Sequence, residues 1–157
     1  MILLNGVTGF FDEKNKPPNL QDSKLFKQVC YHVVNKLDGK LVGFKLPHTT
    51  ANFHHATIRI SEKVTHLLLN PYYNFLALAS SVSFEQIVFI DDSLLNKEFM
   101  DYFRVLSSAE LNMSLSVMQR AGKFVLDHLN ELNTFELQQI AYWKPETVGE
   151  VIFNQWD

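Results

Sequence analysis

The spacing of apolar residues changes near residue 40, and this change restricts the chain to a fold that mixes helices and strands. Before that point, apolar residues recur three and four positions apart, as on one face of an amphipathic helix. The residues of this face are Leu25, Phe26, Val29, Cys30, Val33, Val34 and Leu37. Ser23 is a suitable N-cap and Asp38-Gly39 a suitable end, so a helix is expected over residues 23–37.

After residue 40 the apolar segments are short and bounded by polar residues, which is typical of strands. Within residues 56–60, Ile58 and Ile60 alternate with polar residues, as in a strand that is buried on one face. Residues 61–63 follow at once and favour a hairpin. The candidate strands are residues 41–44, 56–60, 64–69, 74–79 and 85–90. They predict an antiparallel sheet of four to five strands packed with several helices.

The C-terminal part, from Asp91 onward, is expected to be mainly helical. Asp92 or Ser93 can cap the first of these helices. Further helices are expected over residues 134–141 and 145–154, the latter with Pro145 in its first turn.

The length and composition indicate one domain. A chain of 157 residues with 46% hydrophobic and 20% charged residues can bury one core, and no linker divides it. We therefore expect residues 1–157 to form a single α+β domain. No apolar stretch is long enough to span a bilayer and no export signal is visible, so a cytoplasmic protein without a membrane partner is expected. The single Cys30 cannot form an internal disulfide, which fits a reducing compartment and a buried thiol.

The charge is distributed unevenly along the chain. Residues 1–69 contain nine Lys and Arg against five Asp and Glu, whereas residues 70–157 contain five against twelve. An acidic half attracts basic partners. The same imbalance argues against a nucleic-acid partner, for which a basic stripe is expected.

Two groups of acidic residues are the candidates for partner binding. The first is Asp91, Asp92, Glu98 and Asp101, and the second is Asp127 with Glu131. The alternatives are that these residues are solvated helix surfaces and that Asp92 is simply a helix cap. A rival binding surface is the basic, loop-rich region around Lys14, Lys16 and His54-His55.

The residues that usually carry catalysis do not form a recognised motif. The chain has no Gly-x-Ser-x-Gly elbow and no complete phosphate loop, so no catalytic residue and no cofactor is predicted. Six histidines are present, but their spacing does not predict a metal site; His54 and His66, across the expected hairpin, are the closest approach to a pair. A small enzyme that uses Asp91, Asp92 and His54 or His55 remains an alternative, provided that these groups meet in one pocket.

The C-terminal segment is the most distinctive part of the sequence. Trp143, Phe153 and Trp156 either complete the core or contact a partner, where Trp side chains often dominate the binding energy. The ending YWKPETVGEVIFNQWD, the upstream EQIVFIDD and the repeated ELN at residues 110–112 and 131–133 resemble immunity proteins of bacterial polymorphic toxin systems, including contact-dependent growth inhibition.

This resemblance implies a function but not a fold, because such immunity proteins have many unrelated folds. It implies that the protein binds and neutralises one cognate toxin, commonly a basic nuclease, inside the producing cell. A homodimeric adaptor that associates through its C-terminal helices is a further alternative.

Overall fold

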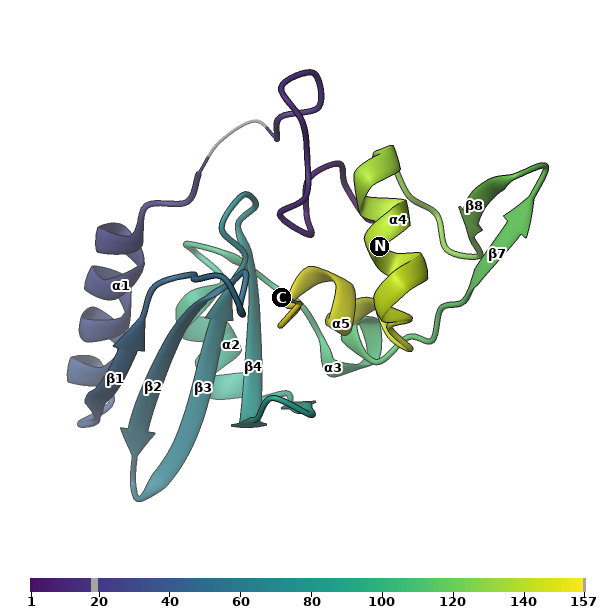
Figure 1. The fold of residues 1–157 in the computed structure, drawn as a ribbon. Coiled ribbons are helices and arrows are strands. Elements are labelled where there is room, and N and C mark those ends of the chain that lie inside the picture. The colour runs from purple at the N-terminus through teal and green to yellow at the C-terminus, as the bar shows by residue number, and fades with distance from the viewer. Residues whose placement is uncertain (18–19, 157) are drawn as a thin grey trace.

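The computed structural model describes residues 1–17 and 20–156, and it is a single α+β fold (Figure 1). In this part of the chain, the main sheet has six strands. Five of them are antiparallel neighbours in the order β1-β2-β3-β4-β5, and β6 pairs with β4 in parallel. The strands are β1 Lys40–Lys45, β2 His54–Ile60, β3 Lys63–Leu69, β4 Phe75–Val82, β5 Ile87–Phe89 and β6 Arg104–Val105. The predicted antiparallel sheet is confirmed, with one short strand more than expected.

The hairpin between β2 and β3 is confirmed as well. Ile60 pairs with Lys63, so Ser61 and Glu62 form the turn. Both have positive φ, 49° and 67°, as a tight turn with the right-handed twist of the strands requires. Neither is glycine, so the extensive pairing of β2 with β3 must offset the strain of about 1 kcal/mol per residue.

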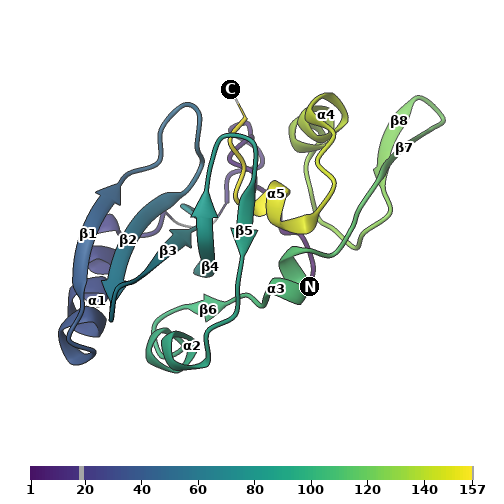
Figure 2. The ribbon, with the colours of Figure 1, turned by 90° about the horizontal axis from the view of Figure 1, so that it is seen from below.

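Both faces of the sheet are buried, which explains why β3 and β4 contain almost continuous apolar runs. Leu67 and Leu69 point to the face covered by α1, Ser23–Lys36, while Leu68 points to the opposite face. α2, Ser93–Phe99, covers the same face as α1 (Figure 2). Cys30 of α1 is buried in this layer, and burial raises the pKa of its thiol to about 12. The N-cap of α1 is Asp22, one residue before the predicted Ser23.

The C-terminal part is not mainly helical, so that expectation is not supported. Its helices are short and alternate with strands. Each of them begins after an irregular segment, at an N-cap residue: Ser107, Asn133 or Thr147. The elements are α3 Ser108–Leu111, β7 Val117–Arg120, β8 Lys123–Leu126, α4 Thr134–Trp143 and α5 Val148–Ile152. The last helix therefore begins after Thr147 instead of at Pro145. β7 and β8 form a separate two-stranded hairpin that projects from the body (Figure 1).

One buried carboxylate fastens the N-terminal segment to α4. Glu136 is fully buried and accepts hydrogen bonds from the N–H of Gly6 at 2.7 Å and from the N–H and hydroxyl of Thr8 at 3.0 and 2.6 Å. It also accepts from the backbone and side chain of the N-cap Asn133. Burial raises the pKa of Glu136, and these hydrogen bonds oppose the increase.

Asparagine side chains join the N-terminal segment to the C-terminal tail. Asn70 donates to the carbonyls of Val7 and Ile152 at 2.8 and 2.9 Å. Asn52 donates to the carbonyl of Thr8 at 3.2 Å and accepts from the N–H of Asn154 at 2.9 Å. Segments from both ends of the sequence are thereby held side by side, and this places the tail that carries Trp156. No helix in the described part of the chain is long and apolar enough to cross a membrane.

Candidate functional site

A cleft of about 470 Å³ lies between the loop that joins β4 to β5 and the segment that contains α5. Three glutamates line it, together with several aromatic side chains. We call it the acidic cleft and define it by Phe84, Glu85, Trp143, Glu146, Glu150 and Trp156. Its volume is in the range of sites that bind a small molecule or a side chain of a partner.

The β4–β5 loop places Phe84 and Glu85 at one wall of the acidic cleft. Ser83 closes the loop through its N–H and its hydroxyl, which both donate to the carbonyl of Gln86, at 2.9 and 3.0 Å. The side chain of Gln155 donates to the carbonyl of Ser83 at 2.7 Å and ties the loop to the C-terminal tail. Phe84 is 73% exposed, although an aromatic ring of this kind usually packs inside.

The two tryptophans form the opposite wall. Trp143 ends α4, and its indole N–H donates to Gln139 at 3.2 Å. Its ring is nearly parallel to that of Trp156, with 2° between the planes and 6.4 Å between the centroids. Trp156 also contacts Phe10, with 6.1 Å between centroids, and is only 9% exposed. This wall is therefore preformed, because Trp156 packs between Phe10 of the N-terminal segment and Trp143 of α4.

The electrostatic character of the acidic cleft is negative. Glu85, Glu146 and Glu150 are all exposed, and the residues that line the cleft include no Lys or Arg. None of the three takes part in an ion pair among the described residues. The carboxylate of Glu150 accepts the N–H of Glu146 at 2.7 Å, which keeps the two side chains at the start of α5. Carboxylates next to aromatic faces suit guanidinium and ammonium groups, which bind to both.

The structure gives the first predicted group of acidic residues roles within the fold. Asp91 accepts from the N–H and hydroxyl of Ser108, and these hydrogen bonds hold the pKa of Asp91 below its usual value. Asp92 caps α2, as predicted, and lies 3.3 Å from the ammonium of Lys63. The remaining two acidic residues of this group, Glu98 and Asp101, differ in whether they form an ion pair.

Glu98 forms an ion pair with Lys36 at 2.9 Å, and its side chain is only 13% exposed. Asp101 is exposed and makes no hydrogen bond or ion pair within the described residues. Of the four, Asp101 is therefore the one whose carboxylate is free for a partner.

The second predicted group lies elsewhere on the molecule. Asp127 accepts from the N–H and hydroxyl of Ser116 at 2.7 and 2.9 Å, and these bonds hold its pKa below the usual value. Glu131 is exposed. Both follow the β7–β8 hairpin, which Figures 1 and 2 show away from α2. The structure does not bring the two predicted groups together on one surface.

The residues of the acidic cleft were only partly visible in the sequence. Trp143 and Trp156 belong to the C-terminal segment that the sequence singles out, and Glu146 and Glu150 lie between them. Phe84 carries no such signal, and Glu85 begins the EQIVFIDD segment, where a strand was expected. Both are distant in the sequence from the C-terminal segment and reach the cleft only through the loop between β4 and β5.

The histidines pair differently from the prediction. His66 lies opposite Thr57 in the hairpin, and its Nδ1 is 2.8 Å from Nε2 of His55, not of His54. Side chains alternate along β2, so His54 points to the other face of the sheet. Burial, together with the charges of the nearby His66 and Lys45, lowers the pKa of His55 to about 4. Across residues 1–17 and 20–156, no group of three or more His, Cys, Asp or Glu side chains could hold a metal ion.

The rival basic surface is an ordinary exposed loop. Lys16 forms an exposed ion pair with Glu13 at 2.7 Å, and such pairs contribute little. Since His54 and His55 point to opposite faces of β2, they do not form one surface with this loop.

Comparison with known proteins adds no further guidance: no protein-family model, curated protein or solved structure matches this chain.

Proposed function

We propose that this chain is an immunity protein that binds a basic cognate toxin domain, of the nuclease kind, through the acidic cleft. The observation that carries the proposal is the placement of three exposed glutamates around aromatic side chains, without a basic residue in the lining. The sequence resemblance of the C-terminal segment to immunity proteins supports it, because that segment supplies most of the cleft.

A basic partner fits the physical chemistry of this surface. A nuclease needs positive charge to bind the phosphates of its substrate. An acidic surface on an inhibitor accelerates the encounter with such an enzyme and selects against acidic partners. An arginine of the toxin could contact Glu146 or Glu150 and stack on Trp143 at the same time, and buried Trp and Arg contacts of this kind dominate many interfaces.

The alternative of a small enzyme has less support. Asp91 and Asp92 line a separate hollow of about 300 Å³, and the described residues around it include no histidine. His54 and His55 belong to other cavities on β2. An enzyme that used these acids and a histidine would need them in one pocket.

A second protein contact is favoured by the exposed apolar side chains around the projecting hairpin. Met118 and Val125 on the hairpin, Leu129 after it, and Phe135 and Tyr142 on α4 are all exposed. A two-stranded hairpin alone is only marginally stable in water, and its open edges can pair with another chain. This region is therefore the candidate contact for a homodimer, or for a second part of the toxin.

The proposal is tested by co-expressing the chain with the C-terminal domain of any toxin that an adjacent gene encodes, and by measuring growth and the affinity of the purified pair. The cleft variant combines Glu85→Gln, Glu146→Gln and Glu150→Gln. The control combines Glu13→Gln, Asp38→Asn and Glu62→Gln, which removes the same charge from exposed positions outside the cleft and outside both predicted acidic groups.

We expect the cleft variant to weaken binding on the order of 100-fold, at about 1 kcal/mol for each lost charged contact, and to reduce its salt dependence. The control should bind within about threefold of the wild type, a change of well under 1 kcal/mol. Absence of binding and protection would overturn the immunity proposal. Equal loss in both variants would show that only net charge matters and would remove the cleft from the proposal.

A further inference from the structure

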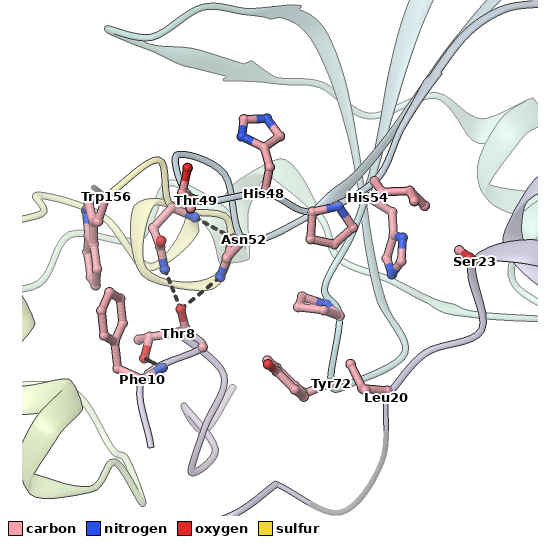
Figure 3. Close-up of a pocket in the computed structure, with 15 residues that line it drawn as sticks. Thr8, Phe10, Leu20, Ser23, His48, Thr49, Asn52, His54, Tyr72 and Trp156 are labelled. Atoms are coloured by element: carbon pink, nitrogen blue, oxygen red, sulfur yellow. Dashed lines mark hydrogen bonds between the residues drawn. The ribbon is translucent and has the colours of Figure 1, made fainter. Parts of the chain in front are cut away.

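Figure 3 shows a second cavity, of about 510 Å³. It lies next to the acidic cleft, and the two share Trp156 and Asn154. We call it the His54 cavity. Five parts of the chain line it: the N-terminal segment, the residues around the start of α1, the β1–β2 loop with the first residue of β2, the turn after β3, and the C-terminal tail. Its walls include Phe10, Leu46, Pro47, Pro71, Tyr72 and Trp156.

His54 lies on one wall of this cavity and is the exception among its buried polar side chains. It is only 4% exposed, and neither ring nitrogen has a hydrogen-bond partner among the described residues. Asn52 and Asn154, by contrast, both donate to the carbonyl of Thr8, at 3.2 and 3.0 Å. The asparagines are therefore engaged in holding the backbone, and His54 is left without a comparable role.

An unpaired buried imidazole destabilises the fold, because its nitrogens have lost their hydrogen bonds to water without gaining others. Its neighbour Phe26, with 6.1 Å between ring centroids, provides an apolar contact that a phenylalanine or leucine at this position would also make. Burial lowers the pKa of His54, so the ring is neutral and has one donor and one acceptor nitrogen. A polar group of a ligand could satisfy either of them.

The other lining residues restrict the chemistry of such a ligand. No Lys, Arg, Asp or Glu lines the cavity in the described part of the chain, so a charged ligand would lose its hydration without gaining a counter-ion. The rings of Phe10, Tyr72 and Trp156 and two prolines favour a flat apolar molecule.

We propose that the His54 cavity binds a small, uncharged, planar aromatic molecule that carries an amide-like donor and acceptor and hydrogen-bonds to His54. Neither ring nitrogen is exposed to solvent, so binding includes a turn of the imidazole toward the cavity. This proposal does not rest on the proposed toxin binding, and Trp156 lines both this cavity and the acidic cleft.

The test uses the isolated protein and two probes, benzamide and benzoate, which have the same ring and differ in charge. Binding is followed by NMR through the indole resonance of Trp156 and the imidazole resonances of His54. We expect benzamide to cause saturable shifts and benzoate to bind at least about fivefold more weakly, a difference of about 1 kcal/mol.

Two variants separate binding from folding. His54→Phe keeps a ring against Phe26 but removes both nitrogens, so benzamide binding should fall at least about fivefold, or about 1 kcal/mol, while the denaturation midpoint should stay the same or rise. Leu46→Trp changes a side chain that is 55% exposed, leaves His54 intact and should block the cavity by filling it.

Three results would overturn the proposal: no saturable shift with benzamide, equal binding of benzoate, or unchanged benzamide binding by His54→Phe. Because no toxin is present in this experiment, its failure would leave the proposed immunity function untouched.

Discussion

Trp143 and Trp156 lie parallel to each other, 6.4 Å apart, although one ends a helix and the other belongs to the C-terminal tail. They are the only two tryptophans of the chain, and both line the acidic cleft. The intrinsic tryptophan fluorescence of the protein therefore reports on this cleft and, through Trp156, on the neighbouring His54 cavity.

This arrangement predicts a direct optical response to basic ligands. An oligoarginine peptide should change the tryptophan emission in a saturable way, and added salt should reverse the change, since exposed charge contacts are screened. A fluorescence titration measures it. An oligoglutamate peptide of the same length is the control and should have no effect; a response to both peptides would contradict a charge-selective cleft.

Glu136 is expected to be the most sensitive acidic residue for stability. Glu136→Gln replaces one of the two acceptor oxygens with an amide N–H₂, which would face either the N–H of Gly6 at Oε1 or the N–H of Thr8 at Oε2. The free energy of unfolding should fall by about 3 kcal/mol, because buried donors lose a charged partner. Urea denaturation measures the change. The exposed Glu131→Gln is the matched control and should change stability by about 0.5 kcal/mol or less; similar values for both variants would mean that the buried network contributes little.

The His55–His66 pair predicts a loss of stability in mild acid. The pKa of His55 is lowered from 6.5 to about 4 in the folded protein, first by burial and then by the charge of His66 and Lys45. The unfolded chain therefore binds more protons between these two values, so the contribution of His55 to stability falls as the pH decreases from 6.5 to about 4 and does not change further below that. Burial also lowers the pKa of His66, which adds to the loss in the same direction.

Denaturation midpoints at about pH 7 and about pH 5 measure this loss, and the variant His55→Gln should show a shallower pH dependence than the wild type. An NMR titration of the His55 ring gives its pKa directly. An ordinary value near 6.5 in the folded protein would contradict the prediction.

Gly149 is expected to tolerate no side chain. A Cβ at this position would lie 2.5 Å from Cε2 of the buried Phe89 and 3.0 Å from the backbone oxygen of Leu111. The overpacking of about 1–3 kcal/mol exceeds the gain of about 1 kcal/mol in helix propensity, so Gly149→Ala should destabilise the protein. Thermal denaturation tests this. Gly43→Ala is the control, since its Cβ would meet Thr57 at an ordinary 3.6 Å; equal effects at the two glycines would show that Phe89 moves aside.

Local features of the sequence were sufficient for much of the fold. The apolar spacing predicted α1 within one residue at its C-terminal end, and the alternation in residues 56–60 predicted the β2–β3 hairpin. These elements are visible because their side-chain periods, 3.6 and 2, repeat over several residues. The cap at Asp92 could also be predicted, because its side chain bonds to the N–H of Leu95, only three residues further along the chain.

The C-terminal part was harder to predict, because its elements are too short for a period to repeat. α3 has four residues and β6 two, so caps and turn residues decide them more than apolar spacing does. The β7–β8 hairpin depends on positive φ at Ala121 and Gly122, 51° and 76°, and Ala121 gives no sign of this conformation.

The candidate site shows the same division. The sequence by itself determined an α+β chain with an acidic C-terminal half and an aromatic C-terminal segment, because composition and periodicity are local properties. Only the tertiary structure decided which of those acids are free: Asp91, Asp92, Asp127 and Glu98 are engaged by distant serines and lysines, whereas Glu146 and Glu150 are joined by Glu85 across the cleft. Such partners are brought together by contacts between segments far apart in the chain, and no local pattern encodes them.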